Sequence, residues 1–232
     1  MSAAPASLHA VRTRIEQACA RFGRPVKAVR LVAVSKTVEA RRVRELAEAG
    51  QRAFGENYLQ EAMVKQRELA DLRLEWHFIG ALQSNKARDA ARHFDWVHGV
   101  DRLRLAQRLS AAAQDRTTAL NVCVQVNVSG ETSKSGCAPE SAAELCHAVG
   151  DLPGLRLRGL MAIPAPSAAP EPVCQAYRGL RELFDHIRGQ GLALDTLSAG
   201  MSDDLETAIA EGSTLVRVGS ALFGQRPRRA AL

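Results

Sequence analysis

The hydrophobic and polar positions of this chain follow a pattern that repeats eight times. Short apolar or β-branched runs predict strands at 30–35, 52–55, 76–79, 96–100, 122–128, 155–163, 194–198 and 215–219. Stretches with helical periodicity lie between them, at 38–49, 58–69, 86–93, 103–114, 139–149, 173–190 and 204–211. An amphipathic helix at 8–22 precedes the first strand. The pattern therefore predicts strands and helices in alternation.

Strands that alternate with helices form parallel βαβ units, and eight units in 232 residues average about 29 residues each. We therefore expect a single α/β domain over residues 1–232, a (β/α)8 TIM barrel with an additional N-terminal helix. An open doubly wound sheet is the alternative, although Ser35-Lys-Thr37 stands where that fold has its glycine-rich fingerprint. The proline-rich segment 163–172 could link two domains, but neither side would then close a barrel. We expect it, like segment 129–136, to be a loop at the C-terminal ends of the strands.

Composition excludes several classes of protein. With 46% hydrophobic and 24% charged residues, the chain is typical of a soluble globular protein. The net charge of +6 comes from scattered arginines, and only 4% of residues are aromatic, so we expect no specific nucleic-acid partner. No apolar run approaches the roughly 18 residues of a membrane span, and no secretory signal is evident. Five cysteines without a Cys-x-x-Cys pair favour a reducing cytoplasm and no structural metal.

Lys36 ends the first predicted strand and is the most informative residue of the chain. The sequence contains five lysines and 26 arginines, so lysine is rare where positive charge alone would suffice. A desolvated lysine can lose its proton and attack a carbonyl carbon, which arginine cannot do. Lys36 is therefore a candidate for a Schiff base, the alternative being a strand-end side chain that reaches solvent.

In a barrel, polar and small residues at the strand ends meet at one mouth. The residues placed there are Lys36, Asn57, Gly80, Ser129, Ser198 to Met201, Gly219 and Ser220. The last two strand ends often bind phosphate in this fold, and we weight Ser198, Gly219 and Ser220 as contacts. Ser202 could also contact the phosphate, the alternative being that it caps the N-terminus of the next helix. Asp203 and Asp204 would repel a phosphate, and we expect them to favour the N-terminus of the next helix.

Three further residues have two interpretations each. Arg217 alternates with Val216 and Val218, so it should point into the barrel with Gly219. There it would form an ion pair or donate to a ring nitrogen of a bound cofactor. His77 and His98 are acid/base candidates near pH 7 or, alternatively, core histidines.

Six motifs together resemble the pyridoxal phosphate homeostasis protein family, whose fold is similar to the N-terminal barrel of alanine racemase. They are Ala33-Val-Ser-Lys-Thr37, Phe54-Gly-Glu-Asn57, Trp76-His-Phe-Ile-Gly80, Gln83-Ser-Asn-Lys86, Leu197-Ser-Ala-Gly-Met-Ser-Asp-Asp204 and Val216-Arg-Val-Gly-Ser-Ala-Leu-Phe-Gly224. The resemblance covers nearly the whole chain. Members of the family often have Met-Gly-Met where this chain has Ala199-Gly200-Met201, a small change at a packing position.

The resemblance implies that Lys36 holds pyridoxal 5′-phosphate (PLP) as a Schiff base. It implies that Asn57 lies near the cofactor and that Arg217 faces the pyridine nitrogen. It implies that Ser198, Gly219 and Ser220 hold the phosphate, and we also expect Gly200 and Met201 to bind the cofactor.

An arginine at the pyridine nitrogen disfavours ring protonation and leaves PLP a weak electron sink. The only tyrosines, Tyr58 and Tyr177, lie in predicted helices, and the chain ends eight residues past Gly224, so we expect no tyrosine of the kind that racemases use. We therefore expect a non-catalytic, cytoplasmic and monomeric protein that binds and buffers PLP and delivers it to apo PLP-dependent enzymes. The alternatives are a PLP-dependent amino-acid racemase that uses His77 or another mouth residue, and a barrel that binds another phosphorylated metabolite without a Schiff base.

Overall fold

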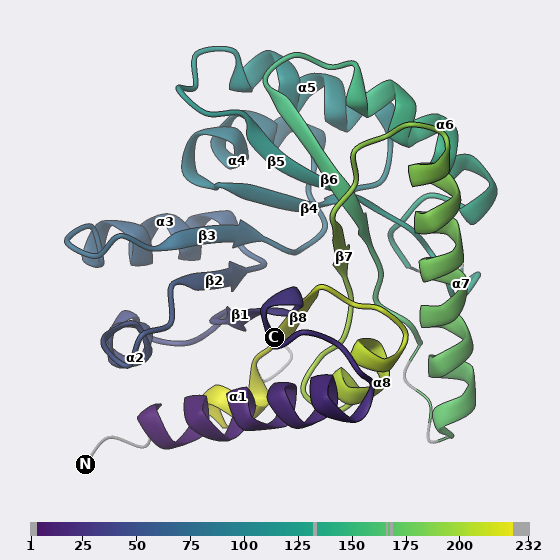
Figure 1. The fold of residues 1–232 in the computed structure, drawn as a ribbon. Coiled ribbons are helices and arrows are strands. Elements are labelled where there is room, and N and C mark those ends of the chain that lie inside the picture. Colours follow the sequence, from purple (N-terminus) through teal and green to yellow (C-terminus); the bar gives the residue numbers. More distant parts are fainter. Residues whose placement is uncertain (1–3, 132–133, 166, 168, 225–232) are drawn as a thin grey trace.

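The strands form a closed parallel barrel in the order β1 to β8 (Figure 1). The computed structural model describes residues 4–131, 134–165, 167 and 169–224. Its strands are β1 Arg30–Val34, β2 Ala53–Glu56, β3 Glu75–Phe78, β4 Trp96–Val100, β5 Leu120–Gln125, β6 Leu155–Met161, β7 Thr196–Ser198 and β8 Leu215–Val218. The predicted (β/α)8 barrel is confirmed, and the open sheet is wrong because β1 pairs with β8 over four residues.

Helices surround the barrel on its outside (Figure 1). They are α1 Ala4–Arg21, α2 Ala40–Glu48, α3 Leu59–Glu68, α4 Ala87–His93, α5 Leu103–Ala113, α6 Pro139–Gly150, α7 Pro170–Gly189, α8 Leu205–Ala210 and α9 Ser220–Phe223, with 3-10 turns at η1 Val26–Ala28 and η2 Ser84–Lys86. The additional N-terminal helix is confirmed. Its buried positions, among them Leu8, Val11 and Ile15, recur every three or four residues, which gives α1 one apolar face.

Two helices differ from the sequence-based expectation. Helix α7 begins at Pro170, inside the segment expected to be a loop, because proline fits the first turn of a helix, where no N–H bond is needed. The short helix α9 was not expected. It follows β8 directly and places Ser220 at the C-terminal end of the barrel.

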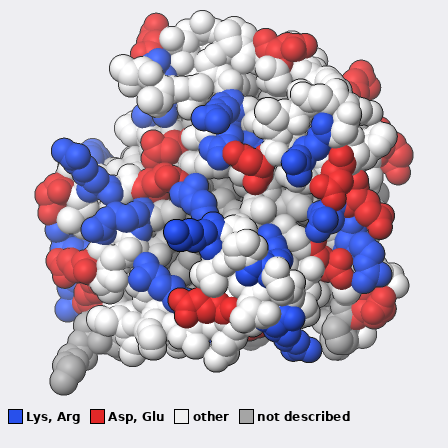
Figure 2. All heavy atoms as spheres, viewed as in Figure 1, with Lys and Arg blue, Asp and Glu red and all other residues white. Residues whose placement is uncertain are grey.

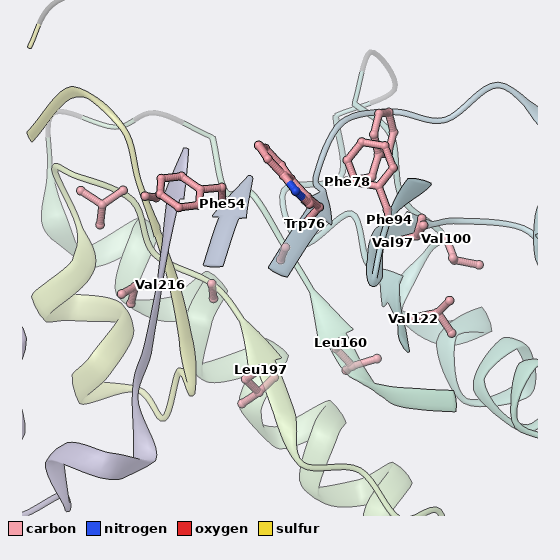
Figure 3. Packing of buried hydrophobic residues seen from close by; sticks show 14 of the residues in the cluster. Phe54, Trp76, Phe78, Phe94, Val97, Val100, Val122, Leu160, Leu197 and Val216 are labelled. Carbon is pink, nitrogen blue, oxygen red and sulfur yellow. The ribbon is translucent and has the colours of Figure 1, made fainter. Parts of the chain in front are cut away.

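Most of the core lies between the strands and the helices. Figure 3 shows side chains of successive strands in this layer, among them Phe54, Trp76 and Phe78. Phe78 contacts Phe94 edge to face, with ring centroids 5.3 Å apart. Because side chains alternate along a strand, the neighbours Glu75 and His77 face the barrel interior instead.

None of the helices in the described ranges is long and apolar enough to cross a membrane. All five cysteines lie in the described part of the chain, and all are free thiols.

Candidate functional site

A cavity of about 450 Å³ opens at the C-terminal ends of the strands. Its wall contains six of the eight residues that the sequence placed in the site, namely Lys36, Asn57, Met201, Arg217, Gly219 and Ser220. The remaining lining residues are Val34, Ile79, Ile163, Ser202 and Asp203. The fold therefore brings together Val34 of β1 and Arg217 of β8 with residues that follow β1, β2, β3, β6, β7 and β8.

Lys36 lies in a tight turn directly after β1. The next residue, Thr37, has φ 62, a left-handed conformation that is rare for a β-branched residue. The N–H of Thr37 donates to Glu61 Oε1, while the ammonium of Lys65 lies 2.6 Å from the carbonyl oxygen of Ser35. The turn is thus held on both sides of the partly buried Lys36 by residues of α3.

Lys65 belongs to a buried charged cluster that the sequence analysis missed. Its Nζ lies 2.8 Å from Glu56 Oε1 and 2.6 Å from Glu61 Oε1, and Ser35 Oγ donates to Glu56 Oε1 at 2.6 Å. Burial raises the pKa of Glu56, although the charge of Lys65 opposes this shift. The signal in the sequence was the one used for Lys36, a lysine in a chain that otherwise uses arginine, here four residues after a glutamate.

Asn57 carries a buried polar atom without a partner. Its Oδ1 makes no hydrogen bond with any described residue. Gly80 permits this position, because a Cβ at residue 80 would lie 2.7 Å from the Asn57 carbonyl oxygen. A buried acceptor without a donor is costly, so Asn57 is suited to a ligand that donates a hydrogen bond.

Arg217 points into the barrel as expected, and only 3% of its surface is exposed. Its Nη1 donates to Ser198 Oγ at 2.5 Å, and its Nη2 donates to the carbonyl oxygen of Ala162 at 2.9 Å. Among the described residues no carboxylate forms an ion pair with it, so the ion-pair alternative is wrong. Burial lowers its pKa, while the nearby Tyr177 and Asp204 act in the opposite direction.

Ser198 and Gly200 lie behind the cavity wall. The Ser198 hydroxyl is fully buried, and it contacts His98 Nδ1 at 2.8 Å as well as Arg217. Gly200 has φ 94, and its carbonyl oxygen accepts the N–H of Arg217 at 2.9 Å. This turn brings Met201 and Ser202 to the cavity, so Ser202 lies on the wall where the sequence analysis had favoured Ser198.

The acidic pair after β7 is arranged differently from the expectation. Asp204 occupies the N-cap position of α8 without capping it. Its carboxylate accepts the N–H of Met201 at 2.5 Å and the hydroxyl of Tyr177 at 2.8 Å. Asp204 thus folds the 200–204 loop onto α7, and Tyr177 is fully engaged there, with a pKa raised by burial and by this carboxylate.

His77 and His98 are buried inside the barrel and do not line the cavity. Their rings contact each other, with His77 Nδ1 2.9 Å from His98 Nε2. Burial lowers the pKa of His77, although Glu75 opposes this, and burial lowers that of His98 more strongly. Both histidines are therefore neutral core residues near pH 7. Among the described residues no group of three or more His, Cys, Asp and Glu could hold a metal ion.

Comparisons with known proteins identify the family to which the chain is similar. A family model described as alanine racemase, N-terminal domain, matches residues 6–227. The chain is 58% identical to the pyridoxal phosphate homeostasis protein of Pseudomonas aeruginosa over 97% of both chains, and 49% identical to that of Escherichia coli K12 over 95% of both.

Solved structures show the same barrel. PipY of Synechococcus elongatus is 38% identical without PLP, with a TM-score of 0.87 over 95% of this chain and 100% of that one. With PLP bound it is 41% identical, with a TM-score of 0.80 over 90% and 100%. Alanine racemase of Clostridium difficile has a TM-score of 0.73 at 15% identity, over 94% of this chain and 57% of that one, and this likeness concerns the fold alone.

Proposed function

Because the chain belongs to the pyridoxal phosphate homeostasis protein family, we propose that it binds PLP as a Schiff base on Lys36, buffers the cofactor and delivers it. The observation that carries this proposal is the cavity that joins the Lys36 amine, the Arg217 guanidinium and the unpaired Asn57 oxygen. Bound PLP would supply an aldehyde for a lysine amine and a dianionic phosphate for a cradle of small residues.

The residues of the wall fit PLP. The volume of about 450 Å³ lies within the range of small-molecule sites. Arg217 can only donate, and the pyridine nitrogen is the acceptor that we assign to it. Asn57 Oδ1 would accept from a ring substituent or from a bound water.

We assign the phosphate to the part of the cavity wall formed by Met201, Ser202, Gly219 and Ser220. Gly219 has no side chain to keep a phosphate away from the backbone, and the hydroxyls of Ser202 and Ser220 supply donors. Ser198, which the sequence analysis had favoured, would hold Arg217 in place instead, because its hydroxyl is buried behind the wall.

We further propose that the protein is not an enzyme. Among the residues that the structure describes, the cavity wall contains three charged side chains, those of Lys36, Asp203 and Arg217. Racemisation needs an acid/base on each face of the substrate. Neither His77 nor Tyr177 lines the cavity, so among the described wall residues Asp203 is the acid/base candidate besides Lys36. A Lys36-dependent exchange of the α-hydrogen of alanine or serine in heavy water would contradict the non-catalytic assignment.

The assignment of Lys36 is tested by absorption spectroscopy and mass spectrometry. Protein reconstituted with PLP is expected to show a visible band that borohydride bleaches, with a covalent adduct on the peptide that contains Lys36. Lys36→Ala should lose both signals, whereas Lys27→Ala, at an exposed lysine of η1, should keep them. A wild-type protein that stays colourless with PLP would refute the proposal, and phosphate-dependent binding without an adduct would favour another phosphorylated metabolite.

Delivery is a separate part of the proposal. We expect a cytoplasmic monomer that passes PLP to apo PLP-dependent enzymes. Mixing PLP-loaded protein with such an apoenzyme should restore its activity faster than the release of PLP into buffer allows. Activation no faster than release would restrict the protein to a buffering role.

A further inference from the structure

A continuous line of hydrogen-bonded side chains crosses the barrel interior from the cavity to the opposite face. Arg217 Nη1 lies 2.5 Å from Ser198 Oγ, which lies 2.8 Å from His98 Nδ1. His98 Nε2 lies 2.9 Å from His77 Nδ1, and His77 Nε2 lies 2.6 Å from Glu75 Oε1. The line uses residues of β8, β7, β4 and β3, and its three middle members are fully buried.

The chemistry of the groups determines where each proton lies. A carboxylate only accepts, so His77 Nε2 donates to Glu75, and because both rings are neutral His98 Nδ1 accepts the proton of the Ser198 hydroxyl. A guanidinium only donates, so Ser198 Oγ accepts from Arg217. A neutral His98 that accepts at Nδ1 carries its proton on Nε2 and donates it to His77 Nδ1. His77 then carries its proton on Nε2 and donates it to Glu75. All the bonds therefore point the same way, from Arg217 to Glu75.

The two ends of the line carry opposite charges. Burial alone would raise the pKa of Glu75, but the hydrogen bond of His77 and the charge of Arg30, 2.9 Å away, lower it to about 2. Glu75 is therefore a carboxylate near pH 7. Arg217 is buried and forms no ion pair with a described residue. Asp204 is a nearby carboxylate that acts on its charge, and Glu75 is the carboxylate that the hydrogen-bond line joins to it.

Glu75 reaches water at the N-terminal face of the barrel. It lines a cavity of about 590 Å³ whose wall also contains Arg52, Arg73, Arg116 and Arg156. Figure 2 shows this face, with Lys and Arg side chains around a central hollow. The carboxylate thus lies at the opposite end of the barrel from the site on which it would act.

We propose that Glu75, His77, His98 and Ser198 are positioning residues that hold Arg217 and set how strongly its guanidinium donates to a bound ligand. The line orients the guanidinium through Ser198, and its distant carboxylate offsets part of the positive charge that the ligand meets. Loss of that carboxylate makes Arg217 a stronger donor. With PLP bound as proposed above, the hydrogen bond from Arg217 to the pyridine nitrogen changes in strength. In that last step the inference rests on the proposed function.

The hydrogen-bond line is tested without cofactor, by nitrogen-15 NMR of the imidazoles in the wild-type protein. His77 and His98 are expected as neutral rings with the proton on Nε2, and their N–H signals should persist because both rings are buried. The other four histidines, His9, His93, His147 and His186, are exposed and serve as internal references. Ser198→Ala should shift the Nδ1 signal of His98, and Glu75→Gln should shift the Nε2–H signals of both rings. A proton on Nδ1 of either ring, a charged ring at pH 7, or an unchanged His98 signal in Glu75→Gln would overturn the inference.

Its effect on the ligand is tested with PLP-loaded protein. Glu75→Gln retains an acceptor for His77 but removes the negative charge. The absorption maximum of the bound PLP should therefore shift, and so should the ratio of the two absorption bands that the tautomers of its Schiff base give. Glu182→Gln, at an exposed position of α7, should match the wild type. If Lys36 carries the borohydride adduct but the spectra of both variants equal the wild type, the inference fails and the proposed function stands. If no adduct forms, the proposed function fails, and the NMR experiment still decides whether the line exists.

Discussion

At the scale of single residues, the choice of lysine over arginine marks two positions with different roles. Lys36 lies on the wall of the cavity, and its role as a Schiff base stays a proposal. Lys65 lies one layer deeper, where it pairs with Glu56 and Glu61 and holds the turn that carries Lys36. A compact ammonium with three donors can satisfy Ser35 O, Glu56 and Glu61 at once, which explains why lysine stands there.

Replacing Lys65 with methionine should destabilise the fold by about 3–5 kcal/mol, because a carboxyl group remains buried without its partner. Urea denaturation measures this change. The double variant Lys65→Met with Glu56→Gln should recover part of the loss, since it removes the charge as well. The matched control Lys27→Met, at an exposed lysine, should stay within about 0.5 kcal/mol of the wild type. An equal effect of Lys65→Met and Lys27→Met would show that the cluster does not stabilise the turn.

At the scale of elements, the close approach of neighbouring strands limits which residues a strand position can have. The register between β5 and β6 shifts after Val122, where Gly159 enters the pairing. Gly159 has φ 154, and a Cβ there would lie 1.9 Å from the carbonyl oxygen of Thr196 on β7. Glycine is therefore required where β6 lies between β5 and β7.

Gly159→Ala should destabilise the protein by about 3 kcal/mol or more, because backbone atoms of two paired strands must move apart. The control is Gly179→Ala in α7, where nothing lies within 4 Å of the new Cβ. Alanine in a helix is favoured over glycine by about 1 kcal/mol, so this variant should equal or exceed the wild type in stability. Thermal and urea unfolding of both variants measure the difference. A Gly159→Ala protein as stable as the wild type would contradict the close approach.

At the scale of the whole molecule, the barrel has two chemically different ends. The mouth contains small residues, hydroxyls and Lys36, whereas the opposite face contains a cavity rich in arginine with Glu75 on its wall. A polar line through the interior joins the two ends. The polar side chains of the interior therefore connect the positive charge of Arg217 at the mouth with the negative charge of Glu75 at the opposite face.

The ion pair between Glu75 and Arg30, at the face opposite the mouth, predicts how the free energy of unfolding depends on pH. The pKa of Glu75 is lowered from 4.5 to about 2, so the folded state binds this proton less tightly than the unfolded chain. The contribution is present above about pH 4.5 and is lost as pH falls towards 2. Glu75→Gln should therefore lose less stability than the wild type between pH 5 and 3, measured as urea unfolding free energies. Parallel curves for Glu75→Gln, Glu182→Gln and the wild type would contradict the shift.

The amino-acid sequence alone determined the barrel and the side of the barrel where the cavity lies. Alternation of apolar and polar positions is a local property, and parallel strands joined by helices place all strand ends at one mouth. For this reason Lys36, Asn57, Arg217, Gly219 and Ser220 could be assigned to one site before the structure was known. The direction of Arg217 followed from strand alternation in the same way.

Only the tertiary structure decided which side chains meet inside the barrel. His98 and Ser198 are separated by 100 residues, and their contact depends on the stagger of eight strands, which no local pattern encodes. The positions of Ser198 behind the wall and Ser202 on it depend on one left-handed turn at Gly200. Periodicity specifies which face a residue lies on, whereas a hydrogen bond requires atoms within about 3 Å, a precision that only the packed barrel supplies.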